Sequence, residues 1–331
     1  MLDINFNQII ELIEKRKNNA YRKVNEEMIL LYLDVGQFLY ELIENGHYGD
    51  KITTKAADFM KNNYPEVRGF TKRNIERMVQ FYKTYKDDEI ATPLVTQLSW
   101  TNNLLILSGS KSEEERHFYL KLSIKENYSK RELDRQITSS YYERYMLSDG
   151  NLLPTKTKTI DEDDYPNTRI LDTYSLEFLD LPSVYSEKDL KNAIIANLKD
   201  FILEVGKDFT FIGDEYRVQV GNHDFFIDLL FYNRELSCLV AFELKLGEFK
   251  AEYLGKMNLY LEALDRDVKK PQENPSVGII LCSSKDKDVV EYSLSKNMSQ
   301  TLISEYKLKL IDKKLLETKL SEMKKLLGNK D

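Results

Sequence analysis

The sequence predicts an α+β or α/β protein, in which an all-helical N-terminal domain precedes a C-terminal domain with the element order αβββαβ. Three observations support this organisation. From about residue 5 to residue 146, apolar residues recur at three and four positions, which indicates helices. A stretch rich in Pro, Gly, Thr and acidic residues then breaks the periodicity. Beyond it come short runs rich in Phe, Val, Ile and Tyr, which favour strands.

Length and composition fit a folded protein with two domains. The chain has 331 residues, of which 42% are hydrophobic and 31% are charged, a balance typical of globular proteins. Its opening segment lacks the features of a signal peptide, and no apolar run approaches the roughly 20 residues needed to span a bilayer. We therefore expect a cytoplasmic protein without a membrane partner. Cys238 and Cys282 lie in apolar runs outside any CxxC pair, so we expect reduced core residues and no zinc site.

The domain boundaries follow from these changes in pattern. We expect a helical domain over 1–147, a linker over 148–169 and the mixed domain over 170–331. At its C-terminal end, the segment from about residue 312 predicts a helix that packs on its own domain. Its expected apolar face consists of Leu316, Leu320, Met323 and Leu327. A short dimerising coil is the alternative for this helix, although the seam is too brief for the three or four heptads that a coiled coil needs.

The mixed domain is predicted element by element. Ser186 is a suitable N-cap and Gly206 a suitable end for one helix between them, with an apolar face at Leu190, Ile194, Leu198 and Ile202. The runs FTFIGDEYRVQV, DFFIDLLFYN and LSCLVAFELKLG then predict an antiparallel meander of three strands. AEYLGKMNLYLEALDRD predicts a helix, and SVGIILCSS predicts a strand in the interior of the sheet.

The helical domain contains a segment in which basic residues are concentrated. Its sequence, TTKAADFMKNNYPEVRGFTKRNIERMVQFYKTY, predicts a helix, a turn and a second helix with Thr71 as N-cap. The net charge of −7 argues against a nucleic-acid-binding surface over the whole protein, but a local basic patch acts over about one Debye length, ~8–10 Å. The basic residues of the segment are Arg68, Lys72, Arg73, Arg77, Lys83 and Lys86. One interpretation is a helix-turn-helix or winged-helix module that binds DNA, and the other is a helical hairpin that serves assembly.

Three charged residues occur where the predicted strands should contribute core residues. Asp228 stands among large apolar residues in its run, and Glu243 and Lys245 do so in the next. A carboxylate in such a setting calls for a cation or a metal as partner. Glu243 and Lys245 share one face of their strand because side chains alternate. If the two runs form a hairpin, Asp228 falls almost opposite Glu243, on strands about 4.8 Å apart.

Oxygen ligands without His or Cys nearby favour a hard cation, so we expect Mg²⁺ at Asp228 and Glu243, with Mn²⁺ as a substitute. The ion would lower the pKa of a bound water and offset the charge that develops on a phosphate during hydrolysis. Lys245 would then orient the attacking water and stabilise the phosphate oxygens. A buried structural ion pair is the alternative interpretation of the same residues.

The spacing of Asp228 and Glu243-x-Lys245 on consecutive strands resembles that of the PD-(D/E)XK nuclease superfamily. More narrowly, FFIDLLFYNRELSCLVAFELKLGEFKAEYLGKMNLYLEALD, ENPSVGIILC and VVEYSL resemble the bacterial YhcG-type nuclease family. GFTKRNIERMVQFYKTY, LSW and YSKRELDRQI extend the likeness to nearly the whole chain. The resemblance implies a restriction-endonuclease-like fold, DNA as substrate, and a metal bound by the acidic pair and by the backbone carbonyl of Leu244.

Further residues follow from the resemblance or from their position. Some branches of the superfamily place Gln-x-x-x-Tyr where this chain has Lys256 and Tyr260, so both are candidate catalytic residues; a surface lysine and a core tyrosine are the alternative. Glu204 could add a carboxylate to the metal, although we expect it to face solvent. The three histidines, His47, His117 and His223, have no spaced partner in the sequence, and His223 is expected to be a solvated turn residue.

Together these features predict a Mg²⁺-dependent deoxyribonuclease whose helical domain binds DNA or a partner protein. No GxxxxGK[ST] loop is present, so we expect no nucleotide cofactor in this chain. A homodimer would suit an enzyme that cuts both strands of a duplex, and partner proteins from defence or recombination are open alternatives. The competing hypothesis is a non-catalytic nucleic-acid-binding or scaffold protein that keeps the nuclease fold.

Overall fold

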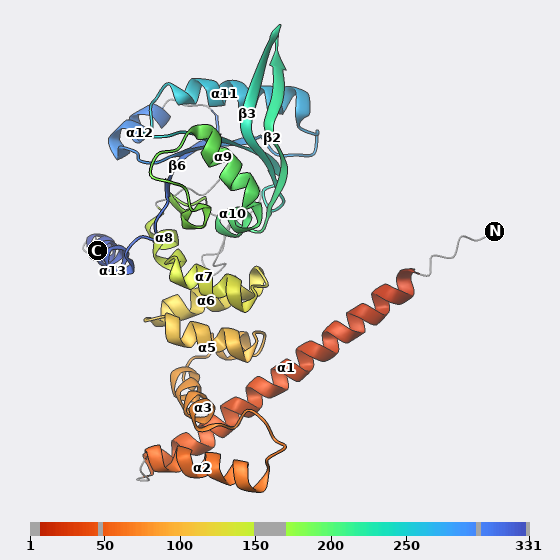
Figure 1. Ribbon diagram of the computed structural model, residues 1–331, viewed down its shortest axis with the longest axis vertical. Coiled ribbons are helices and arrows are strands. Elements are labelled where there is room, and N and C mark those ends of the chain that lie inside the picture. The colour runs from red at the N-terminus through yellow and green to blue at the C-terminus, as the bar shows by residue number, and fades with distance from the viewer. Residues whose placement is uncertain (1–6, 46–48, 149–169, 296–298, 329–331) are drawn as a thin grey trace, which may run out of the picture. The chain divides into compact units, whose positions relative to one another are not determined.

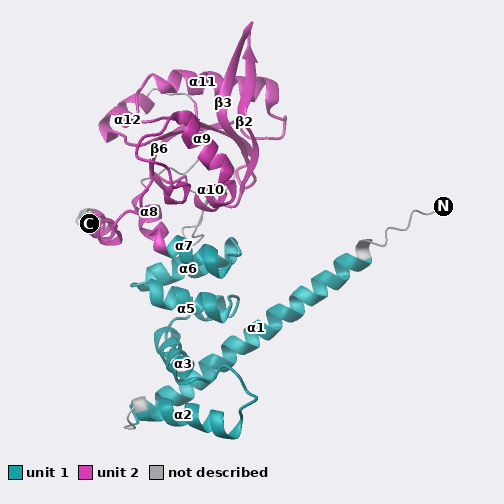
Figure 2. Ribbon diagram, viewed as in Figure 1, with its two compact units in different colours: residues 1–137 teal, residues 138–331 magenta. Residues whose placement is uncertain are grey.

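The computed structural model describes residues 7–45, 49–148, 170–295 and 299–328. The chain divides into two compact units, Met1–Ile137 and Thr138–Asp331 (Figure 2). This division precedes the boundary that the sequence suggests at residue 147, so the helix just before that boundary belongs to the second unit. The linker expected over 148–169 lies, apart from its first residue, outside the described residues.

The described part of the first unit is built from helices joined by turns and loops, as the periodicity predicts. Its elements are α1 (Asn7–Glu44), α2 (Gly49–Asn63), α3 (Lys72–Tyr85), α4 (Thr92–Val95), α5 (Trp100–Gly109), α6 (Glu113–Lys125) and α7 (Lys130–Thr138), which ends at the boundary (Figure 1). In α1, Gly36 lies against α3, where an added Cβ would stand 2.3 Å from the Met78 carbonyl oxygen. The absence of a side chain therefore permits the close approach of these two helices.

Helix α3 begins where the sequence predicts. The Thr71 side chain accepts a hydrogen bond from the Asn74 backbone N–H, which is the expected N-cap. The helix buries Ile75, Met78, Phe81 and Tyr85 and leaves its other face to solvent. The segment 64–71 that joins α2 to α3 is longer than the three or four residues of a helix-turn-helix turn, so the pair is a helical hairpin with a longer connection.

The second unit contains a six-stranded mixed sheet in the order β1-β6-β5-β4-β3-β2. Its strands are β1 (Thr173–Ser175), β2 (Phe209–Val220), β3 (His223–Asn233), β4 (Cys238–Leu244), β5 (Val277–Cys282) and β6 (Thr301–Lys307). Strands β2, β3 and β4 form the predicted antiparallel meander, and β5 is the predicted interior strand, buried along its whole length. Strands β1 and β6 were not predicted and extend the sheet in parallel beyond β5.

The helix predicted between Ser186 and Gly206 is in fact two helices. Helix α9 (Glu187–Ala196) and helix α10 (Leu198–Val205) are separated at Asn197, whose φ of −113° and ψ of 33° are not helical. The break shifts the buried face: Leu190 and Ile194 are buried as expected, whereas α10 buries a different set from the expected Leu198 and Ile202. That set comprises Phe201, Leu203, Glu204 and Val205.

Helix α11 (Tyr253–Ala263) is the helix predicted after the meander and continues into a π-helical turn, Leu264–Val268. It lies over one face of the sheet (Figure 1), with Met257 and Leu261 in the same core cluster as Ala241 and Ile280. At Gly278 on β5, an added Cβ would stand 2.5 Å from Met257 Cγ. This glycine therefore sets how closely α11 approaches the strands.

The remaining helices of the second unit are η1 (Glu177–Leu179), α8 (Tyr141–Leu147), α12 (Lys287–Leu294) and α13 (Lys313–Gly328). Helix α13 is the predicted C-terminal helix, with Leu316 and Leu320 buried. It packs against α8 and forms an ion pair from Lys313 to Glu143. Helix α8 belongs to the same unit but lies within the 1–147 domain as the sequence bounds it, so packing on the 170–331 domain alone is not what the structure shows. The side chain of Leu327 lies outside the described residues. Cys238 and Cys282 are free and buried, as expected.

Glu204 contradicts the expectation of a solvent-facing carboxylate. It is 0% exposed and forms a buried ion pair with Arg144 of α8. Its Oε1 also accepts a hydrogen bond from the Ser175 backbone N–H at 2.7 Å. A buried carboxylate requires such partners, and these hold α8, α10 and β1 together. Across the described ranges, no helix is both long enough and apolar enough to span a membrane.

Candidate functional site

The candidate site lies where β3 separates from β4. The last residues that the two strands pair are Leu229 and Phe242, and Asp228 and Glu243 follow directly beyond this pair. From there β3 continues with β2 alone as a two-stranded hairpin (Figure 1). The predicted hairpin register is therefore present, and the end of the ladder places both carboxylates at the edge of the paired region. The Asp228 carboxylate accepts a hydrogen bond from the Leu244 backbone N–H at 2.8 Å.

Glu243 is the buried centre of this group. Its side chain is 1% exposed, and its Oε1 lies 3.0 Å from the Lys245 Nζ and 2.6 Å from the Lys256 Nζ. Its second oxygen, Oε2, is buried and has no hydrogen-bond partner within the described part of the chain. A buried carboxylate oxygen without a donor is costly, so this atom is a ready ligand position for a cation.

Lys245 connects the strands to helix α9. Besides Glu243, its Nζ contacts the Glu187 carboxylate at 3.1 Å, and its side chain is 14% exposed. Burial alone would lower the pKa of Lys245, but the charge and hydrogen bond of Glu243 outweigh burial and raise it. The lysine therefore stays charged at neutral pH. Glu187 is the first residue of α9 after the capping box that Ser186 forms with Asp189.

Helix α11 contributes Lys256 and Tyr260, one turn apart. Lys256 is 45% exposed and bonds Glu243, so it belongs to the group and is not an isolated surface lysine. Burial is the largest single influence and opposes its charge, but the hydrogen bonds and charges of Glu243 and Tyr260 together outweigh burial and raise the pKa of Lys256. Tyr260 is 0% exposed, and its hydroxyl donates to the Phe226 carbonyl oxygen at 2.5 Å. It is therefore a core tyrosine that fixes β3 two residues before Asp228.

The surroundings of Asp228 favour its neutral form, whereas those of the two lysines favour their charged form. Burial raises the pKa of Asp228, and the nearby charge of Glu243 raises it further, against the hydrogen bond from Leu244. Two carboxylates that compete in this way share a site which favours a proton or a cation. The arrangement of two acids, two lysines and an unbonded buried oxygen is that of a site which can bind a divalent ion and an anion together.

The predicted basic residues of the first unit lie on and just before α3. Most of these side chains are exposed to solvent, namely Arg68, Lys72, Arg73 and Lys83, whereas Arg77 is partly buried. Lys72 pairs with Glu76 at 3.6 Å on the solvent face. Lys86, by contrast, donates to the Tyr40 hydroxyl of α1 at 3.4 Å and lies over that ring, so it is engaged within the unit.

Sequence reasoning missed Glu187 and the partners of His117. Glu187 looked like an ordinary acid in the first turn of a helix, where acids complement the helix dipole. The contact with Lys245 depends on the fold, so no local signal marks it. His223 is exposed at the start of β3, as expected for a turn histidine, and His47 lies outside the described residues. His117 has partners that the sequence reading did not find, described below.

Comparison with known proteins covers both units. Residues 167–321 match the YhcG PDDEXK nuclease domain model, and residues 8–144 match the DUF1016 N-terminal domain model. The chain is 31% identical over 345 residues to the Escherichia coli (strain K12) protein named "Putative nuclease YhcG", covering 94% of this chain and 92% of that protein.

Two solved structures are similar to part of the chain. One is a repair endonuclease from Pyrococcus abyssi, with 18% identity over 40% of this chain and 50% of that chain at a TM-score of 0.27. The other is an EndoMS complex with double-stranded DNA, with 17% identity over 38% of this chain and 47% of that chain at a TM-score of 0.28. The two domain models together span most of the sequence. The chain therefore belongs to the YhcG family of PDDEXK nucleases.

Proposed function

We propose that this chain is a divalent-metal-dependent deoxyribonuclease whose centre consists of Asp228, Glu243 and Lys245. The observation that carries the proposal is the buried, unbonded Oε2 of Glu243 beside Asp228, a carboxyl whose pKa is raised. Most buried carboxylate oxygens in folded proteins are satisfied by donors, so an unbonded one in a group with a second acid is a candidate ligand position. The nuclease activity of the family supports the same assignment.

The residues present fit a hard divalent ion. Asp228 and Glu243 supply carboxylate oxygens, the Leu244 carbonyl is the further ligand that the family resemblance implies, and neither His nor Cys belongs to the group. Such a set of oxygen ligands favours Mg²⁺, with Mn²⁺ as a substitute, over softer metals. When bound, the ion supplies Lewis-acid stabilisation of phosphate charge and lowers the pKa of a coordinated water.

The protein side chains then have separate tasks in phosphodiester hydrolysis. Lys245 is charged and close to Glu243, where its ammonium group orients the attacking water and offsets charge on the non-bridging phosphate oxygens. The water oxygen loses a proton and forms the new bond to phosphorus while the bond to the leaving oxygen breaks, and the leaving oxygen takes up a proton, so that no net proton is gained or lost in the step. Lys256 holds Glu243 from the side of α11 and balances its charge, and Glu187 positions Lys245.

We further propose that the exposed basic residues on and before α3 bind the DNA backbone. Arg68, Arg73 and Lys83 are exposed, and no acid pairs with them in the described part of the chain. Contacts between such residues and phosphates supply affinity without sequence specificity. The nuclease unit would then act on DNA that the first unit retains.

The decisive experiment is a cleavage assay with supercoiled, linear and single-stranded DNA in Mg²⁺, in Mn²⁺ and in EDTA. We expect cleavage only with a divalent ion, and we expect Asp228→Ala and Lys245→Ala to lose at least about 100-fold in rate, the scale of removing one preorganised charge stabiliser. Matched controls are Asp214→Asn on β2 and Lys250→Ala in the loop after β4, both exposed, which should keep the wild-type rate.

The result also separates this proposal from a protein that only binds nucleic acid. Metal-independent cleavage, or cleavage that survives both substitutions, would remove the proposed centre. DNA binding without cleavage by folded wild-type protein in either metal would favour the non-catalytic alternative. The oligomeric state of the complex on duplex DNA, measured by light scattering, tests the homodimer that a duplex cutter suggests.

A further inference from the structure

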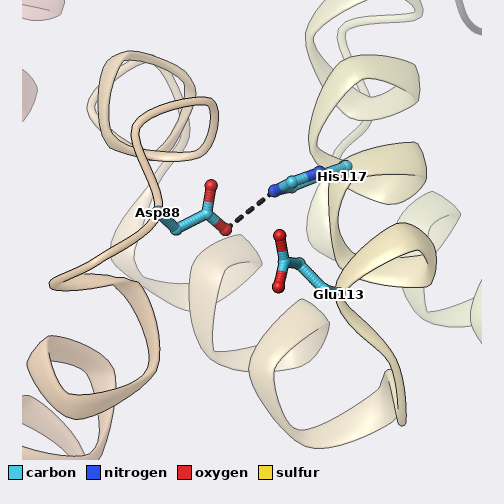
Figure 3. Close-up of side chains that lie close together, drawn as sticks. All are labelled: Asp88, Glu113 and His117. Carbon is cyan, nitrogen blue, oxygen red and sulfur yellow. Dashed lines mark hydrogen bonds and ion pairs between the residues drawn. The ribbon is translucent and has the colours of Figure 1, made fainter.

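A second group of metal-ligating side chains lies in the first unit, apart from the nuclease centre. Asp88 stands in the connection between α3 and α4, and Glu113 and His117 stand on the first turns of α6 (Figure 3). One ligand atom from each residue lies within 4.8 Å of the other two. The His117 Nε2 is 2.7 Å from the Asp88 Oδ2. All three side chains converge on one point, as Figure 3 shows.

The local structure holds these three residues in place. Ser112 caps α6 by accepting from the Glu115 N–H, which fixes the start of the helix. Because Glu113 and His117 are four residues apart, their side chains lie on the same face of α6. On the opposite side, the Asp88 Oδ1 accepts from the Ala91 N–H at 2.8 Å, which leaves Oδ2 directed at His117.

The carboxylates of this group form no ion pair with a lysine or arginine among the described residues. Asp88 instead contacts His117. The side chains of Asp88 and His117 are 8% and 16% exposed, so water screens this pair poorly. Two carboxylate oxygens and one imidazole nitrogen held this close together form a set of ligands that a divalent ion can share.

A second observation comes from Tyr85, at the end of α3. Its side chain is 1% exposed, and its hydroxyl has no hydrogen-bond partner within the residues that the structure describes. Burial raises the pKa of Tyr85, the charge of Arg116 lowers it, and the smaller effect of Asp88 raises it. Tyr85 also adjoins the cluster in the chain, because its backbone carbonyl oxygen accepts a hydrogen bond from the Asp88 N–H at 3.1 Å.

We propose that Asp88, Glu113 and His117 form a second metal site, which takes a borderline divalent ion of the Zn²⁺ type and joins the α3–α4 connection to α6. One imidazole nitrogen with two carboxylate oxygens suits Zn²⁺, whereas Mg²⁺ favours oxygen ligands alone. Three protein ligands leave a coordination position for water. The expectation of no zinc site, drawn from the cysteines, did not consider this combination of residues.

The test uses the full-length chain with the nuclease centre silenced by Asp228→Asn and Glu243→Gln, so that the outcome does not depend on the proposed catalysis. After metal removal, calorimetric titration with ZnCl₂ should give one site per chain, and tenfold excess Mg²⁺ should not displace the ion. Adding His117→Gln or Glu113→Gln should weaken binding by at least about tenfold, because even residues that only support a metal ligand contribute 10- to 100-fold.

The matched control is His223→Gln, which removes an exposed histidine far along the chain and should leave zinc affinity unchanged. Glu113 is exposed, so its substitution leaves the fold intact and keeps the test valid if the His117 variant is unstable. Zinc should also raise the melting temperature of the silenced protein and not that of its Glu113→Gln variant. Absence of zinc binding, or affinity equal in all these variants, would overturn the second site.

Discussion

Asp228 shows that a residue proposed for catalysis can lower the stability of the folded protein. Burial and the charge of Glu243 raise the pKa of Asp228. A carboxyl with a raised pKa in the folded chain favours folding while it is protonated, and this contribution is lost as the pH rises through the folded-state value. When Asp228 is ionised and no metal is bound, it therefore destabilises the folded protein, and a bound cation reverses the effect.

The direction of this pKa shift predicts that one substitution at Asp228 changes stability and activity in opposite directions. Asp228→Asn should raise the melting temperature in EDTA at pH 7, by about 2–4 °C for each kcal/mol regained in a domain of this size, while it abolishes cleavage. In saturating Mg²⁺ the order should invert, since only the wild type gains stability from the ion. Differential scanning fluorimetry with and without Mg²⁺ checks both parts. A variant that is less stable than the wild type in EDTA would contradict the assigned electrostatics.

Single residues also show what the sequence could predict of the site. Asp228, Glu243 and Lys245 were identifiable because charged residues interrupt apolar strands, and strand alternation then predicts which of them share a face. Glu187 was not identifiable, since its contact with Lys245 joins segments far apart in the chain. The same holds for Asp88 with His117, although the four-residue spacing of His117 from Glu113 was visible in the sequence.

At the scale of elements, long periodic segments were predicted and short or interrupted ones were not. The meander and α11 carry strong residue preferences, whereas β1 has only three residues and β6 mixes charged with apolar residues. The break at Asn197 is hidden because the apolar periodicity continues through it. Tertiary packing decides this case: after the break, α10 turns Phe201 and Glu204 into the core.

Helix α3 carries the prediction at this scale. If its solvent face binds phosphates, Arg73→Ala and Lys83→Ala should each make the slope of log affinity against log salt shallower by about 0.9 for duplex DNA. Fluorescence polarisation at several salt concentrations measures the slope. Lys55→Ala on the exposed face of α2 is the matched control. If α2 and α3 serve assembly instead, neither slope nor affinity should change.

For the whole molecule, the important question is where the nuclease unit begins. The sequence suggests residue 147, whereas the contacts group everything from Thr138 onward. The difference matters because Arg144 on α8 pairs with Glu204, and both side chains are buried almost completely. Removal of one member of a buried ion pair leaves an unbalanced charge and costs about 3–5 kcal/mol.

Two fragments therefore distinguish the boundaries. Residues 138–331 should fold and cleave DNA with the metal requirement of the full chain, because they contain all residues of the proposed centre. Their DNA binding should be weaker and less sensitive to salt, because they lack the basic residues of α3. Residues 148–331 lack Arg144 and should unfold at a markedly lower temperature or denaturant concentration. Circular dichroism melts and the cleavage assay compare the two, and Asp228→Asn in the longer fragment confirms that any cleavage is its own. Equal stability of both fragments would show that α8 and its ion pair are dispensable, and a folded but inactive 138–331 would mean that the first unit contributes to catalysis itself.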